Sequence, residues 1–211
     1  MALIRWLKTN PAFRLTLWVP AYLVLFLIVE QRIPSSVWVT QLPIDGFIPF
    51  CEWFLIPYVL WYPLLIFLGV YLCRTDIPAF RRYMCFLATT FFISALIWLL
   101  LPNMQDLRPM TMPRENALTA VISLLYTVDT NTNVFPSVHV VGSLGAILAV
   151  WDSMLKHRHP GVCWSVTVLS LLICLSTVFI KQHSVLDVAA GVVLSLLVAV
   201  WIYGKHPAAQ T

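Results

Sequence analysis

Charge is scarce in this sequence. Only 10% of the 211 residues are Asp, Glu, Lys or Arg, whereas 60% are hydrophobic and the mean hydropathy is +0.86. Soluble domains carry about 25% charged residues, so this composition excludes a soluble protein and predicts an integral membrane protein. The net charge of +4 is modest and is concentrated in a few loops. Such a distribution reflects membrane topology and argues against a nucleic-acid partner.

Cysteine pairs, metal-ligand clusters and internal repeats are also absent. No CxxC pair or Cys/His ligand spacing occurs among the cysteines, which are Cys51, Cys73, Cys85, Cys163 and Cys174. We interpret them as buried thiols. The acidic residues are scattered without a DxD or HxxE grouping, so the sequence predicts neither a metal ion nor another cofactor.

Six apolar runs approach the length that crosses a bilayer, for which about 20 residues are needed. We predict spans over residues 13–29, 47–73, 84–101, 137–151, 162–180 and 185–203. The first run is followed by no small-residue cleavage pattern, so we expect a retained anchor. The longest polar segment, 102–135, has an apolar middle that predicts a short interfacial helix over 116–126. The predicted fold is all-α, a single membrane domain of residues 1–211 with six transmembrane helices.

The positive charges predict how these spans are oriented. With six spans both termini lie on one side, and that side collects nine cations against four on the other. The nine are Arg5, Lys8, Arg14, Arg74, Arg81, Arg82, Lys156, Arg158 and Lys205. The positive-inside rule then places both termini in the cytoplasm, in a plasma membrane or cell inner membrane. The segment 102–135 and residues 181–187 fall on the extracytoplasmic face, where we expect Glu52 at the membrane interface.

The segment 176–187 carries ionisable groups at a membrane edge, where unpaired charges are costly and usually functional. His183 and Asp187 are four residues apart, so they share one face of a helix. A carboxylate there can accept the proton on one imidazole nitrogen and leave the other nitrogen as a nucleophile or base. Taken alone, the pair fits a structural hydrogen bond equally well.

His139 supplies a second imidazole on the same predicted face. Two histidines can divide phosphoryl transfer, one attacking phosphorus and the other protonating the leaving oxygen and then activating water. Ser137 and the free amides of its helix N-terminus make an anion site. Arg108 and Lys181 are cations that can stabilise a transferring phosphoryl group. We expect Arg114 to be mainly solvated.

Together these residues resemble the type 2 phosphatidic acid phosphatase (PAP2) superfamily of membrane lipid phosphatases. Its three motifs are Lys-x6-Arg-Pro, Pro-Ser-Gly-His and Ser-Arg-x5-His-x3-Asp, and their order and spacing match residues 101–191 here. The resemblance implies a six-helix fold and a metal-independent phosphohistidine mechanism at the extracytoplasmic membrane surface. It also implies roles for five side chains. His183 is the nucleophile, Asp187 its orienting carboxylate and His139 the general acid, while Ser137 and Arg108 bind the phosphate.

The sequence departs from these motifs at three positions. Leu101 stands in place of the first-motif lysine, and Thr177 in place of the third-motif arginine. Val138 replaces the second-motif glycine, although its backbone amide can still bind phosphate. Lys181, four residues after Thr177, is our candidate for the missing cation, and Arg114 is a weaker one.

Part of the pattern is similar to one branch of the superfamily. Ser176-Thr177 ahead of His-x3-Asp, together with Asp129 and Asn131 ahead of Phe-Pro-Ser-x-His, resembles the inositol phosphorylceramide synthases. Those enzymes pass the phosphohistidine to a lipid alcohol. The sequence therefore predicts a lipid phosphate or diphosphate phosphatase, with a lipid phosphotransferase as the alternative. A third possibility is a non-enzymatic lipid-binding or transport protein that retains a degenerate site.

Overall fold

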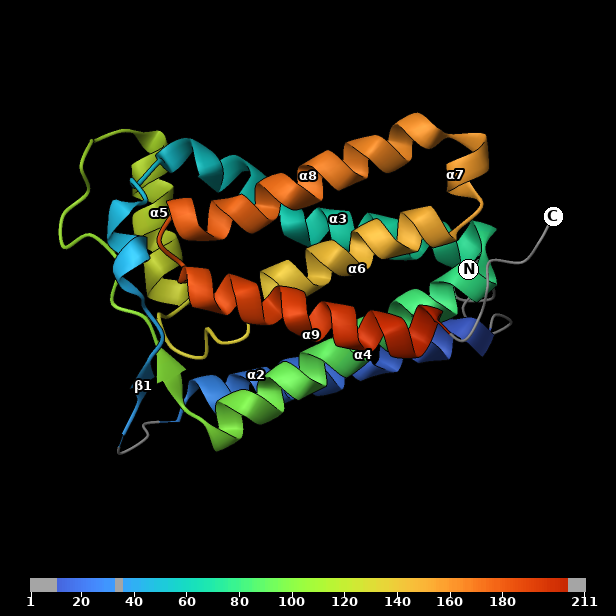
Figure 1. Ribbon diagram of the computed structural model, residues 1–211, viewed down its shortest axis with the longest axis horizontal. Helices are drawn as coiled ribbons and strands as arrows, with labels where there is room; N and C mark the ends of the chain where they lie inside the picture. The colour runs from blue at the N-terminus through green and yellow to red at the C-terminus, as the bar shows by residue number, and fades with distance from the viewer. Residues whose placement is uncertain (1–10, 33–35, 205–211) are drawn as a thin grey trace, which may run out of the picture.

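The computed structural model describes residues 11–32 and 36–204, which form an elongated bundle of long helices with irregular segments gathered at one end (Figure 1). A 3-10 segment, η1 (Pro11–Leu17), leads directly into the first helix. The long helices are α2 (Trp18–Glu30), α3 (Leu55–Thr75), α4 (Ile77–Leu100), α6 (Val138–Asp152), α8 (Pro160–Phe179) and α9 (Val185–Tyr203). Arg5, Lys8 and Lys205, used above to orient the chain, lie outside the described residues.

Five helical segments are long and apolar enough to cross a membrane, which identifies an integral membrane protein. They cover residues 11–30, 52–75, 77–100, 160–179 and 185–203. The predicted span over residues 137–151 corresponds to α6, which has 15 residues and falls short of that length. It packs against α3, α4, α8 and α9 in the middle of the bundle. The described residues therefore contain five candidate spans where six were predicted.

Helix boundaries follow local capping more closely than hydropathy. The α4 helix begins at Ile77 instead of 84, because Asp76 caps it through the Ala79 amide at 3.1 Å and Pro78 occupies its first turn. Arg81 and Arg82 therefore lie inside a helix, and the loop predicted for them is wrong. The α3 helix begins at Leu55, after the short 3-10 segment η3 (Glu52–Phe54), so residues 48–51 are not helical.

The end of the bundle that carries the irregular segments holds the remaining elements. Two short strands, β1 (Trp38–Val39) and β2 (Asn103–Met104), pair in parallel, a small correction to the all-α prediction. The helix α5 (Ala117–Val128) lies across this end and matches the predicted interfacial helix (Figure 1). A 3-10 turn, η2 (Pro43–Phe47), completes it. At the opposite end, the segment between the predicted spans 137–151 and 162–180 contains a helical turn, α7 (Leu155–Arg158).

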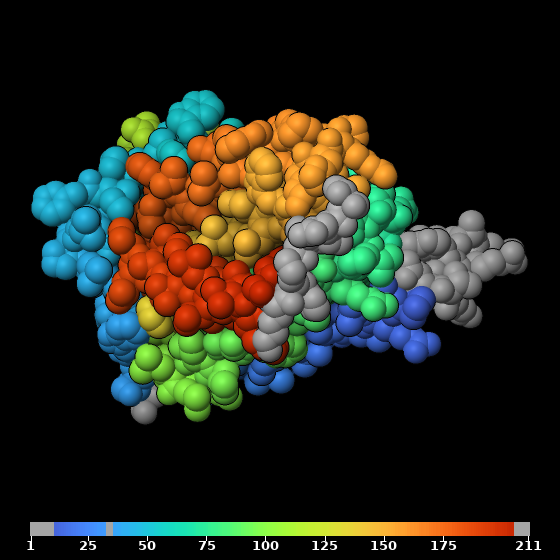
Figure 2. Space-filling model, turned by 45° about the vertical axis from the view of Figure 1, so that its right-hand side comes forward, coloured from blue at the N-terminus to red at the C-terminus, as the bar shows by residue number. Residues whose placement is uncertain are grey.

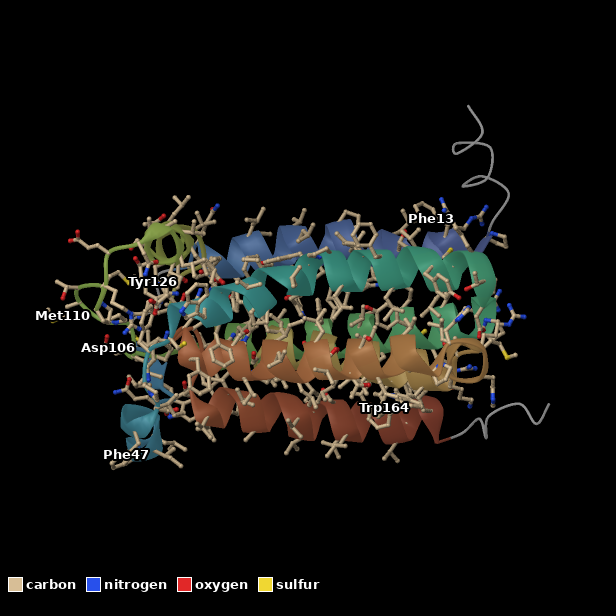
Figure 3. All side chains as sticks on the ribbon, turned by 90° about the horizontal axis from the view of Figure 1, so that it is seen from above. Phe13, Phe47, Asp106, Met110, Tyr126 and Trp164 are labelled. Carbon is tan, nitrogen blue, oxygen red and sulfur yellow. The ribbon has the colours of Figure 1, made fainter. Side chains whose placement is uncertain are left out.

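The bulkiest fully buried side chains are aromatic, whereas large apolar side chains cover much of the outside. Trp98, Tyr83 and Phe86 are fully buried in the core, whereas α9 exposes a row of large apolar residues, such as Leu197 and Val200, as a lipid-facing helix does. The segment between α2 and α3, blue to cyan in Figure 2, projects from one end of the molecule. Phe47, Asp106, Met110 and Tyr126 mark that end in Figure 3.

Candidate active site

The turn between α8 and α9 presents His183. The carbonyl of Thr177, near the end of α8, accepts hydrogen bonds from the backbone amides of Gln182 at 2.9 Å and His183 at 3.0 Å. Lys181 adopts a left-handed conformation with φ of 56°, which reverses the chain. Ser184 then caps α9 in a capping box with Asp187. These contacts leave His183 with only 7% of its surface exposed.

The imidazole of His183 is held by a backbone carbonyl. Its Nδ1 lies 3.0 Å from the oxygen of Val134 and 3.6 Å from Oδ2 of Asp187. Because a carbonyl oxygen only accepts, Nδ1 carries the proton of this hydrogen bond and the lone pair of Nε2 is left free. Val134 thus takes the hydrogen bond that the sequence assigned to Asp187, and the carboxylate remains as a nearby negative charge.

Asn103 fixes the segment that contains Val134. Its Oδ1 accepts hydrogen bonds from the amides of Val134 and Phe135, both at 2.8 Å, and its Nδ2 donates to Leu101. One buried carboxamide thereby aligns the carbonyl that orients His183. Sequence reasoning missed Asn103, whose signal was a short amide residue directly after a long apolar run.

Asp187 is fully buried and joins two helices. Its Oδ2 accepts a hydrogen bond from the Ser184 amide at 2.7 Å, while its backbone carbonyl accepts one from the amide of Ser137 at 3.2 Å. Oδ1 has no hydrogen-bond partner. The backbone carbonyl of Asp187 therefore joins the N-terminus of α6 to the N-terminus of α9, which brings the second histidine close.

His139 is enclosed by aromatic rings. Its imidazole stacks on Tyr58 with ring centroids 4.3 Å apart, and it lies 4.4 Å from Trp61 and 5.9 Å from His183. A Cβ on Gly142 would come within 2.7 Å of the Trp61 indole nitrogen, so glycine at this position permits the close packing. Neither nitrogen of His139 has a hydrogen-bond partner.

Several buried polar atoms around the two histidines have no hydrogen-bond partner within residues 11–32 and 36–204. They are Oγ of Ser137, Oδ1 of Asp187 and both ring nitrogens of His139. Burying a polar group without a hydrogen bond is costly, so native structures seldom keep several such groups side by side. Their concentration here marks a place where a polar ligand would supply the missing bonds.

Arg108 lies beside this cluster and donates mainly to protein oxygens. Its Nη2 donates to the carbonyl of Asp129 at 2.6 Å and to Oε1 of Gln182 at 2.5 Å, and its Nη1 donates to the carbonyl of Tyr126 at 2.9 Å. The guanidinium lies 4.3 Å from the centroid of the Tyr126 ring. Burial lowers the pKa of Arg108, against the opposing effect of the Asp129 carboxylate. Its Nε remains unpartnered.

Lys181 is directed to a neighbouring loop. Its ammonium donates to the carbonyls of Asp45 at 3.0 Å and Ile48 at 2.5 Å, so it ties the α8–α9 turn to η2. Burial lowers the pKa of Lys181. Thr177 likewise donates its hydroxyl to its own helix, at the carbonyl of Cys174. In this arrangement both side chains donate to backbone carbonyls.

Arg114 and Glu52 form an ion pair that the sequence did not indicate. Arg114 donates through Nε at 2.7 Å and Nη2 at 2.6 Å to the two oxygens of Glu52, and Asn116 adds a third hydrogen bond. These bonds raise the pKa of Arg114. Glu52 is only 3% exposed, whereas the Arg114 side chain remains exposed, as expected, while it pairs with Glu52. The pair links the start of α3 to the segment before α5.

A further polar network supports the turn that carries His183. Oδ2 of Asp129 accepts hydrogen bonds from the Tyr58 hydroxyl at 2.7 Å and from Nε2 of Gln182 at 3.2 Å. Nδ2 of Asn131 donates to the backbone carbonyl of Gln105. The side-chain amide of Gln105 in turn donates to the backbone carbonyl of Lys181. Asp129 and Asn131 are thus both joined to the site. Gln105 and Gln182 were missed, although Gln182 directly precedes His183.

A cavity of about 620 Å³ opens beside His139 and continues between α2, α3 and α4. Its lining is mostly apolar and aromatic, with His139, Val138 and Asp129 at the site end and Arg74 in the last turn of α3. Within residues 11–32 and 36–204, no group of three or more His, Cys, Asp or Glu side chains is placed to hold a metal ion.

One comparison with known proteins gives a match. A family model described as the PAP2 superfamily matches residues 82–210, which include α6, α8, α9 and the three motif segments. Neither the curated proteins nor the solved structures contain a match to the chain.

Proposed function

Because the chain belongs to the PAP2 superfamily, whose members are generally phosphatases or phosphotransferases, we propose that it is a lipid phosphate or lipid diphosphate phosphatase acting through a phosphohistidine without a metal ion. The observation that carries this proposal is the proximity of His183 and His139, whose ring centroids lie 5.9 Å apart. Around them are buried polar atoms that have no partner among the described residues. One imidazole has a fixed tautomer with a free lone pair, and the other is held in an aromatic enclosure without hydrogen bonds.

The proposed reaction has two steps. In the first, Nε2 of His183 attacks phosphorus, the bond from phosphorus to the lipid oxygen breaks, and His139 protonates that oxygen as it leaves. In the second, His139 takes a proton from water, the water oxygen attacks phosphorus, and inorganic phosphate leaves His183. The Asp187 carboxylate stabilises the positive charge that develops on His183 while phosphorus is bound to it.

The phosphate would bind at the N-terminus of α6. The Ser137 hydroxyl is free to donate, the amide of Val138 lies in the first turn of a 15-residue helix, and Arg108 retains an unpartnered Nε–H. Backbone amides and a helix dipole favour anions at such a position. Lys181 and Arg114 are not part of the proposed phosphate site, because their charged groups are engaged elsewhere.

The lipid chain would lie in the cavity between α2, α3 and α4, which reaches His139 and is lined mostly by apolar groups. We propose that α6 is the sixth membrane-embedded helix, that both termini are cytoplasmic and that the site faces the extracytoplasmic surface. A cysteine-accessibility experiment with probes at Met110 and Met154, exposed at opposite ends, tests this orientation.

The function is tested by incubating the purified protein in lipid nanodiscs with lipid phosphates and diphosphates and measuring inorganic phosphate. We expect release by the native chain and its loss in His183→Ala and His139→Ala. Ser165→Ala is the matched control, since Ser165 is exposed near the start of α8 and bonds only within that helix. Full phosphate release by His183→Ala would contradict the proposal.

A lipid phosphotransferase is the second candidate, and the cavity favours it. Because the cavity is largely apolar and reaches His139, a lipid alcohol could approach the phosphohistidine as readily as water. Appearance of the phosphoryl group on an added lipid alcohol, with no inorganic phosphate, would select this reaction.

A further inference from the structure

The charges at the site end are unusual for a protein that binds a phosphate. Among the described residues this end carries seven carboxylates and four cations. The carboxylates are Glu30, Asp45, Glu52, Asp106, Glu115, Asp129 and Asp187, and the cations are Arg32, Arg108, Arg114 and Lys181. A dianionic phosphate would add two negative charges to this excess.

The nearest cations do not offset it. Arg114 is paired with the Glu52 carboxylate, and the ammonium of Lys181 donates a hydrogen bond to the backbone carbonyl of Asp45. That leaves Arg108 against the two carboxylates closest to the histidines, Asp129 and Asp187. Two positions that would carry family cations are Leu101 and Thr177, as the motif comparison above indicates. The protein therefore supplies less positive charge than the phosphate needs.

Asp129 contributes a carboxylate to the lining of the cavity. Its Oδ2 is taken by Tyr58 and Gln182, whereas no hydrogen bond reaches Oδ1 in the described part of the chain. Asp129 lines the cavity together with His139, Trp61 and Tyr62. Arg74, the other charged residue of that lining, lies twelve residues beyond Tyr62 in α3, about 18 Å along the helix axis.

A carboxylate beside aromatic faces is a site for an ammonium group. Aromatic rings attract cations through their faces, and a carboxylate adds a charge-assisted hydrogen bond. We propose that the substrate brings its own cation: a lipid phosphate with an ammonium group a few bonds from phosphorus, bound by Asp129. This inference rests on the proposed function and narrows its substrate class, since the ammonium would offset the charge that the protein leaves uncompensated.

Two matched lipids test the proposal in nanodiscs. Both are long-chain amino-alcohol phosphates with the same chain, and they differ only in a free ammonium or an N-acetyl group on the adjacent carbon. Phosphate release gives kcat/KM for each. We expect the ammonium lipid to be preferred by about ten- to a hundredfold, the range that a hydrogen bond between charged groups provides.

Variants separate charge from shape. In Asp129→Asn the preference should fall to less than about threefold, because the amide retains the shape and loses the charge. Asp129→Glu should keep part of the preference. Asp106→Asn is the matched control, since it removes an exposed charge at the same end of the molecule and should leave the preference unchanged. Equal kcat/KM for the two lipids, or a preference that survives in Asp129→Asn, would overturn the assignment.

Binding to His183→Ala protein distinguishes this inference from the proposed function. Equilibrium binding of the two radiolabelled lipids does not require turnover. Tighter binding of the ammonium lipid that depends on Asp129, without phosphate release by the native chain, would uphold the recognition site and refute the phosphatase. Phosphate release with no difference in binding would do the reverse.

Discussion

The two ends of the bundle differ in whether their buried polar groups have hydrogen-bond partners. At the α7 end, Arg82 pairs with Asp152 at 2.6 Å, and Asp76 caps α4 while it accepts a hydrogen bond from the amide of Met154. At the other end, Ser137 and His139 keep buried polar atoms that have no partner. The hydroxyl of Tyr203, near the α7 end, is also buried without a partner among the described residues, but more such atoms gather at the site end, which retains hydrogen-bonding capacity for a ligand. This contrast favours the site end as the place where a ligand binds, without reference to any motif.

The largest expected effect is that of His183→Ala. Removing the nucleophile should lower phosphate release by at least about a thousandfold, because no other group in the proposed mechanism forms the covalent intermediate. Phosphate release in nanodiscs measures it, with thermal unfolding as the check on folding. If His183→Ala releases phosphate at more than a tenth of the native rate, the end of the bundle that carries His183 does not have the proposed catalytic function.

His139→Ala should rank next. General acid–base groups contribute about 10²–10⁴-fold to rate, so kcat should fall in that range. The loss should be smaller for a lipid phosphate ester with a good leaving group, since a stable leaving alkoxide needs less protonation. An equal loss for good and poor leaving groups would contradict the acid role of His139.

Asn103→Ala tests the scaffold of the site. It leaves the amides of Val134 and Phe135 without their acceptor, at about 1–3 kcal/mol for each buried group. Because the carbonyl of Val134 orients His183, we expect lower kcat together with a lower unfolding temperature. Asn103→Asp retains the acceptor oxygen and should recover part of the activity of folded protein. Unchanged kcat in Asn103→Ala would show that His183 is oriented without this carboxamide.

Lys181→Met separates the structural from the catalytic interpretation of this lysine. Two hydrogen bonds to the carbonyls of Asp45 and Ile48 disappear, so stability should fall by about 1–3 kcal/mol. The kcat of the folded fraction should change by less than about threefold, because the ammonium faces η2. A loss of kcat without a loss of stability would return Lys181 to the phosphate site.

The smallest effect is expected at the opposite end. Arg82→Gln breaks a partly exposed ion pair with Asp152, for which about 1 kcal/mol or less of stability is typical. Phosphate release by folded protein should be unchanged. If Arg82→Gln lowers kcat as much as Asn103→Ala does, the two ends are functionally coupled and the contrast between them fails.

Much of the helical architecture followed from hydropathy, and the boundaries did not. The final span, 185–203, matches α9 because a Ser184–Asp187 capping box coincides with the start of the apolar run. The start of α4 was missed because its first turns are polar, with Arg81 and Arg82 inside a helix that Asp76 caps. Hydropathy reports contact with lipid, whereas capping decides where a helix begins.

The site was predictable where chemistry and spacing coincide. His139, His183 and Asp187 were found because ionisable groups are rare in this chain, and the structure brings them together. Asn103 and Trp61 were not found, since their roles depend on contacts between segments far apart in the sequence. For the same reason helical spacing predicts that Lys181 reaches the phosphate, whereas its backbone is left-handed and its ammonium donates to the carbonyls of Asp45 and Ile48.

The most direct test of the account is to trap the covalent intermediate. Native protein is mixed with a phosphate-labelled lipid, quenched within one turnover in alkali, in which phosphohistidine survives, and digested for mass spectrometry. His139→Ala protein, with slowed turnover, serves as a second sample. We expect the label on His183 and nowhere else in the chain. Phosphate on Ser137 or His139, or phosphate release with no labelled protein, would contradict the central claim that His183 is the nucleophile.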